Sequence, residues 1–142
     1  MKQKWLLRTA AILMLLHSLG HTLGTFSWKK TTDPVKKELI SQMTAHAFPI
    51  MGKSRSMTDA MDGYGLVVIL ALLLITAILW ICSGEAVTDQ QLKKKIIALT
   101  AVTLLCWGII ELVYFFPLAA GLTLIAMLFT SISFFSSEKL DK

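Results

Sequence analysis

Charged side chains are scarce in this chain of 142 residues: they make up 16% of it, whereas hydrophobic residues make up 55%. A soluble domain normally carries about 25% charged residues. The apolar residues are also gathered in long blocks instead of being dispersed along the chain. The composition therefore argues against a water-soluble fold and predicts a single-domain integral membrane protein.

Other features are missing as well. The two cysteines, Cys82 and Cys106, both lie inside apolar stretches, where cysteine is usually a small buried hydrophobe, so no disulfide framework is expected. The net charge is +5, but no stripe of lysine and arginine alternates with aromatic residues, which argues against nucleic acid as a partner. Membrane orientation explains the basic residues better.

Four segments are long and apolar enough to cross a bilayer, which requires about 20 residues of helix. They span residues 5–26, 64–82, 96–116 and 118–135. Pro117 separates the last two segments, and proline cannot continue a helical hydrogen-bond ladder, so a tight turn is expected there. The sequence thus predicts an all-α fold, a transmembrane four-helix bundle.

Basic residues indicate how the bundle is oriented. Lys93, Lys94 and Lys95 lie in the loop between the second and third segments, on the same side as the lysines near the N-terminus if the spans alternate. Cytoplasmic loops are enriched in lysine and arginine. Both termini are therefore expected in the cytoplasm, although the loop 29–63 on the opposite side also holds six basic residues.

The long loop between the first and second segments is predicted to contain a short helix over residues 33–48. Asp33 followed by Pro34 is a typical helix start. Apolar residues then recur at four-residue spacing: Val35, Leu39, Met43 and Ala47. We expect this amphipathic helix to lie at the membrane surface, and residues 52–65 to form a connector that leads into the second span.

Three ionisable residues interrupt the predicted spans: His17 and His21 in the first, and Glu111 in the third. Such residues are costly in a bilayer and normally face the bundle interior. With a rise of about 1.5 Å per residue, His21 and Glu111 lie roughly 8 and 9 Å beyond the middles of their spans, hence at one depth. We therefore expect a polar site between the first and third spans, covered by the long loop.

Neighbours on the same helical faces or on the same side of the membrane complete the predicted pocket. Its members are His17, Gly20, His21, Gly24, His46, Tyr64, Trp107, Glu111 and Tyr114. The two glycines share a face with the histidines, and small residues at this spacing let helices approach closely. Trp107 and Tyr114 fit a pocket wall or an interfacial anchor.

Several chemistries fit these residues. In a metal site, His17, His21 and Glu111, with His46, would supply ligands for zinc or iron. Haem is disfavoured because the second, third and fourth segments contain no histidine. A carrier is disfavoured because the chain has no internal repeat.

Three functions remain open. The pocket would bind a small or lipid-like ligand, or it would serve a metal-dependent or acid–base enzyme with a lipid-like substrate. Alternatively, the glycine face would pack on a second copy or on another membrane protein. A purely structural hydrogen bond between a histidine and Glu111 fits equally well. The sequence leaves open whether the protein is an enzyme.

The first segment, His17-Ser18-Leu19-Gly20-His21-Thr22-Leu23-Gly24, and the entry to the second, Asp62-Gly63-Tyr64-Gly65-Leu66, carry a resemblance. They resemble a family of small uncharacterised bacterial membrane proteins with four predicted helices. The resemblance covers about the first 80 residues and implies a bacterial plasma membrane location, but no activity. It also draws attention to Arg55, for which a salt bridge to Asp59 or Asp62 would fix the loop over the site.

Overall fold

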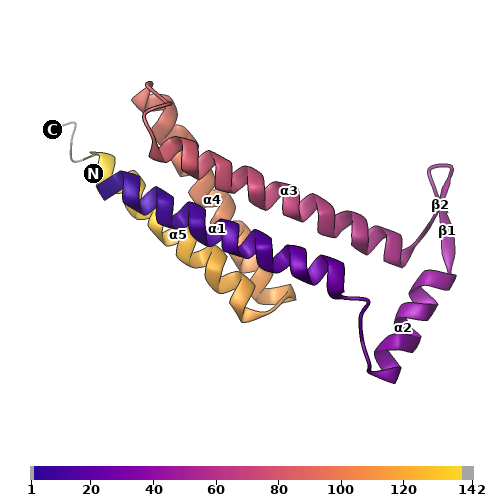
Figure 1. The fold of residues 1–142 in the computed structure, drawn as a ribbon. Coiled ribbons are helices and arrows are strands. Elements are labelled where there is room, and N and C mark those ends of the chain that lie inside the picture. Colours follow the sequence, from indigo (N-terminus) through magenta and orange to yellow (C-terminus); the bar gives the residue numbers. More distant parts are fainter. Residues whose placement is uncertain (1, 139–142) are drawn as a thin grey trace. The chain divides into compact units, whose positions relative to one another are not determined.

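The computed structural model describes residues 2–138, which are almost entirely helical (Figure 1). In chain order the elements are α1 (Lys2–Ser27), α2 (Pro34–Ala45), β1 (Ala47–Ile50), β2 (Lys53–Ser56), α3 (Met57–Ser83), α4 (Gln90–Tyr114) and α5 (Pro117–Glu138). The chain forms two compact units, one of residues 2–18 with 72–138 and one of residues 19–71. Helices α1 and α3 each run through both units.

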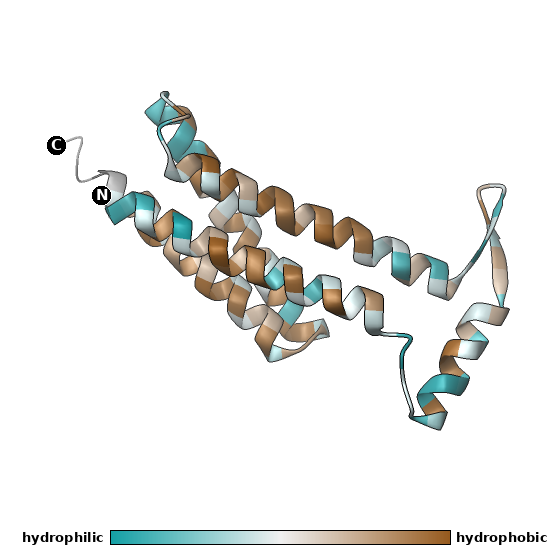
Figure 2. Ribbon diagram, in the orientation of Figure 1, coloured by the Kyte–Doolittle hydropathy of each residue, from teal (hydrophilic) through white to brown (hydrophobic). Residues whose placement is uncertain are grey.

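Four helices are long and apolar enough to cross a membrane, namely α1, α3, α4 and α5. Figure 2 shows that hydrophobic residues fill most of α3, α4 and α5 and that hydrophilic residues gather toward helix ends and loops. The all-helical architecture and its four apolar helices were thus predicted. As expected, α4 and α5 are separate helices, with Phe115 capping the first and Pro117 beginning the second.

Capping residues extend the helices beyond the apolar segments. Asp33 accepts hydrogen bonds from the amides of Val35 and Lys36 at the start of α2, as its sequence predicts. Asp89 caps α4 in the same way, so this helix begins at Gln90 and not at residue 96. Hydropathy locates the apolar part of a helix, whereas the caps decide where the helix begins.

The connector expected over residues 52–65 consists of β2 and the beginning of α3. Ser56 and Asp59 form a capping box, in which the Ser56 amide donates to the Asp59 carboxylate and the Asp59 amide to the Ser56 hydroxyl. Helix α3 therefore begins at Met57.

In the first unit, α4 and α5 form a closely packed helical hairpin. A Cβ atom on Gly108 would lie 2.5 Å from Cδ2 of Leu124, so a larger residue here would displace the Leu124 side chain. At the other end of α4, Lys93 donates to the carbonyl of Gly84, and the Arg8 guanidinium lies 5.1 Å from the centre of the Trp80 ring. Basic side chains thus hold this end of the unit together.

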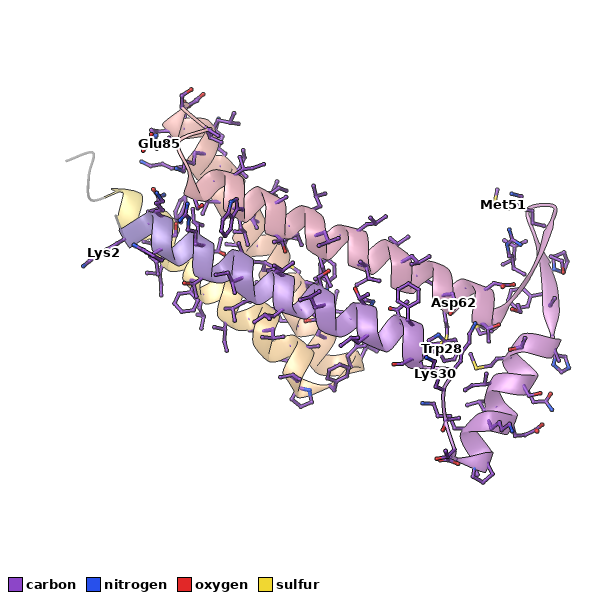
Figure 3. All side chains as sticks on the ribbon, in the orientation of Figure 1. Lys2, Trp28, Lys30, Met51, Asp62 and Glu85 are labelled. Atoms are coloured by element: carbon purple, nitrogen blue, oxygen red, sulfur yellow. The ribbon has the colours of Figure 1, made fainter. Side chains whose placement is uncertain are left out.

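In the second unit, α2 is followed by an antiparallel β-hairpin that the sequence analysis did not predict. Ile50 pairs with Lys53, which leaves Met51 and Gly52 as a two-residue turn. Both have positive φ, 47° for Met51 and 81° for Gly52, as type I′ turns require. Gly52 tolerates this conformation, but Met51 is strained by it, and its side chain is fully exposed at the tip (Figure 3).

The strain at Met51 leads to a prediction about the hairpin. Replacing Met51 by asparagine, which adopts left-handed backbone more readily, should stabilise the hairpin by about 1 kcal/mol. Hydrogen exchange at the hairpin amides should then slow by about fivefold. Met51→Leu is the matched control, because it keeps an ordinary side chain at positive φ. Equal exchange rates in the two variants would contradict this interpretation.

Candidate functional site

Three buried side chains from three helices meet inside the first unit: His17 of α1, Glu111 of α4 and Thr123 of α5. The Thr123 hydroxyl donates to Oε2 of Glu111 at 2.6 Å. Nδ1 of His17 lies 3.0 Å from the same hydroxyl oxygen, and Nε2 lies 3.3 Å from Oε1 of Glu111. At 5% exposure or less for each residue, they form a closed triangle shielded by the surrounding helices.

Donors and acceptors determine where the protons lie. The single proton of Thr123 goes to Glu111, so the hydroxyl oxygen accepts the proton on Nδ1 of His17. Nε2 of His17 faces Oε1 of Glu111 at ion-pair distance, and this contact is an ion pair when the imidazole is protonated. The network therefore places two side chains that can donate or accept a proton in direct contact.

The local sequence explains why the three side chains meet. His17 lies on the buried face of α1, which comprises Leu7, Ala10, Ala11, Met14, His17 and Ser18. Gly108 lies about one turn before Glu111, on the same face of α4, and lets α5 approach there. On α5, Ala119 and Ala120 are buried just before Thr123. Small residues thus bring the polar groups within hydrogen-bond distance.

A contact between Glu111 and a histidine of the first span was predicted, but the depth estimate matched Glu111 with His21, whereas the structure pairs it with His17. The contact with Thr123 was not predicted. The spacing of small and polar residues on α5 indicates that Thr123 lies on the buried face of that helix. The completely buried residues recur every three or four positions: Thr123, Ala126, Thr130 and Ser133. A polar stripe of this kind in an apolar helix marks the face that turns inward, and it can be read from the sequence.

Two other predicted pocket residues belong to the first unit. Trp107 is partly buried, and Tyr114, near the end of α4, is 77% exposed. High exposure suits an interfacial anchor better than a pocket wall.

The remaining predicted residues belong to the second unit, namely Gly20, His21, Gly24, His46 and Tyr64. Apart from the chain neighbours and the nearby backbone of α1 itself, no heavy atom of the described residues lies within 4 Å of a Cβ placed on either Gly20 or Gly24. His46 is exposed, and its Nδ1 lies 3.0 Å from the carbonyl oxygen of Gln42. Nε2 of His21 is buried and has no hydrogen-bond partner among the described residues.

Two polar contacts at the end of α1 correct the expectation that Arg55 forms a salt bridge that fixes the loop. Asp62 accepts a hydrogen bond from the Trp28 indole at 2.9 Å and pairs with Lys29. Figure 3 shows Trp28 and Asp62 close together. Arg55 instead donates to the carbonyl of Ser54, so the salt bridge considered for it is made to Asp62 by Lys29.

A metal site finds no support in the geometry. Among residues 2–138, no group of three or more His, Cys, Asp or Glu side chains is arranged to hold a metal ion. Two of the considered ligands, His17 and Glu111, are in contact. The third side chain of the network is the hydroxyl of Thr123. A neutral hydroxyl is a weak ligand for zinc, which prefers nitrogen, sulfur and carboxylate groups.

In comparisons with protein families, curated proteins and solved structures, the chain shows no significant match. The resemblance to small bacterial membrane proteins therefore stays an expectation, and the function has to be argued from the chain itself.

The closed network predicts an unequal effect of two similar substitutions on α5. Thr123→Val removes the hydroxyl that contacts both His17 and Glu111, and should destabilise the protein by about 1 to 2 kcal/mol. Thr130 is the matched control, since it is equally buried and its hydroxyl donates to the carbonyl of Ala126 in its own helix. Thr130→Val should therefore have a smaller effect on thermal unfolding in detergent. Equal losses would show that the network adds nothing to stability.

Proposed function

We propose that the protein is a multi-pass integral membrane protein of the bacterial inner membrane, with both termini in the cytoplasm. Its four long apolar helices support the membrane location. The lysines at residues 93–95 and those near the N-terminus support the orientation. The bacterial inner membrane follows the resemblance of the first 80 residues.

Helix α2 is proposed to lie on the membrane surface. It has no buried residue, and Val35 and Leu39 are 77% and 58% exposed. A free helix of 12 residues is marginal in water. Burial of the apolar face in the headgroup region would stabilise it, and the lysines on α2 would contact lipid phosphates.

The surface position of α2 predicts different surroundings for its two faces. In a chain carrying Cys82→Ala and Cys106→Ala, a polarity-sensitive fluorophore would be attached to Leu39→Cys or to Lys37→Cys. In vesicles the label at position 39 should show blue-shifted emission, because that face is buried in lipid. The label at position 37 lies on the other face and is the control. Identical spectra would contradict the proposal.

Within the bundle, we propose that the His17–Glu111–Thr123 network binds the polar group of a small lipid-like molecule. The observation that carries this proposal is the direct contact between a buried histidine and a buried carboxyl group. If these residues served helix packing alone, neutral hydroxyls such as that of Thr130 would be sufficient. Neutral hydroxyls are less costly to bury in lipid than ionisable side chains are. An ionisable pair adds the capacity to donate and accept a proton at one place.

The same pair of ionisable side chains supports the second candidate, an acid–base enzyme. A hydroxyl or carbonyl group of a sterol-like or quinone-like substrate could take the place of the Thr123 hydroxyl as the partner of His17 and Glu111. Glu111 would then deliver or remove the proton, and His17 would hold it in the intervening step. Ligand binding is common to both candidates, so it is tested first.

The ligand proposal predicts a difference in the molecules that purify with the protein. Mass spectrometry of organic extracts should find an apolar molecule with a hydroxyl or carbonyl group in the native protein, reduced about tenfold in Glu111→Gln. Thr130→Val should retain it. If the extracts do not differ, the ligand proposal fails. Loss of a co-purifying membrane protein from the same variant would instead favour an interaction subunit.

A further inference from the structure

A cavity of about 340 Å³ lies within the second unit, between the end of α1 and the beginning of α3. It is lined by Thr25, Phe26, Lys29, Asp62 and Leu66. The two helices are in close contact beside it, at Gly65 and Thr25, because a Cβ on Gly65 would lie 2.5 Å from Cγ2 of Thr25. This volume is at the lower end of the range of small-molecule sites, so it suits the headgroup of a lipid and not the whole lipid.

The lining has a polar end and an apolar end. Lys29 and Asp62 form the polar end, and Phe26 and Leu66 form the apolar end. Asp62 and Leu66 are one helical turn apart, which separates the two ends by about 6 Å along α3. Phe26 is 67% exposed and Leu66 48% exposed, so an acyl chain could lie against both. The cavity is therefore amphipathic, as a site at a membrane interface would be.

Opposite charges are paired at the polar end. The Lys29 and Asp62 side chains form an ion pair and are 44% and 42% exposed. An ion pair this accessible to water is worth little, so a ligand that contacts both groups can separate them at small cost. A simple anion would be repelled by Asp62, and a simple cation by Lys29. A zwitterion satisfies both charges.

We propose that this cavity binds the headgroup of an aminophospholipid, a phosphoethanolamine group. Its phosphate accepts hydrogen bonds from Lys29, and its primary ammonium donates to Asp62. Trp28 holds the carboxylate in place through its indole N–H. A choline headgroup carries the same charges but has no N–H to donate, so Asp62 discriminates against it.

The proposal rests on the membrane location given above, but not on the His17–Glu111–Thr123 network. It is tested in nanodiscs made of equal parts of phosphatidylethanolamine and phosphatidylcholine. Native mass spectrometry of the released full-length protein should show selective retention of phosphatidylethanolamine. Lys29→Gln and Asp62→Asn should each reduce that selectivity about tenfold, since each removes one charge-assisted contact.

Two variants separate a binding defect from a folding defect. Lys30→Gln removes the neighbouring positive charge, which does not line the cavity, and should leave the selectivity unchanged. Leu66→Trp keeps the ion pair but fills the cavity, and should abolish the selectivity. Glu111→Gln should retain it, so a failure of the network proposal is distinguishable from a failure of this one.

Three results would overturn the proposal. The first is equal retention of the two lipids by the native protein. The second is a preference for phosphatidylglycerol that depends on Lys29 but not on Asp62, which would indicate a simple anion site. The third is displacement of the lipid by an equal concentration of soluble glycerophosphoethanolamine, which would indicate a soluble ligand. Extraction of the protein from membranes by alkaline carbonate would refute the membrane location itself.

Discussion

The arrangement of the first unit depends on how polar groups are satisfied between apolar helices. In a hydrocarbon environment a carboxyl or imidazole group has no water to bond, so it must find partners in the protein. Glu111 finds one on α1 and one on α5, namely His17 and Thr123. Because each partner also contacts the other, the three helices are tied together at one point.

Small residues make that point accessible. Gly108 permits the close approach of α4 and α5, and the alanines of α1 and α5 keep the surrounding core narrow. Lipid tails are as apolar as leucine side chains, so burial of apolar surface alone does not favour one helix partner over another in a membrane. Specific polar contacts and tight packing must therefore determine which faces meet, and both occur near Glu111.

The second unit differs from the first in where its polar groups lie, which is at the ends of apolar helices. Trp28 and Lys29 follow α1 and both contact Asp62 at the start of α3. The hairpin and α2 have almost no buried side chains, although a two-stranded hairpin is marginal in water by itself. Their exposed apolar residues and the amphipathic cavity both fit an environment of lipid headgroups. The proposed surface helix and the proposed headgroup site thus agree on where the membrane boundary lies.

Much of this could be predicted from the sequence, because the signals are local. The length of an apolar stretch is enough to identify a helix that can cross a membrane, and Pro117 and Asp33 mark helix boundaries through their own backbone chemistry. Ionisable residues in such stretches are conspicuous, so Glu111 was predicted to meet a histidine of the first span, although not His17 in particular. The capping box at Ser56 and the cap at Asp89 were also readable, but apolar length alone does not reveal them.

Only the tertiary structure decided what the polar residues contact. Thr123 resembles other threonines of α5 in sequence, and it differs from Thr130 because Glu111 and His17 happen to face it. Likewise, Asp62 forms its ion pair with Lys29 and not with Arg55. The position of Lys29 is determined by where α1 ends. Pairings between residues distant in the chain depend on helix packing and rotation, and hydropathy carries no information about either. The sequence therefore determined the helices and their polar residues, and the packing determined the sites.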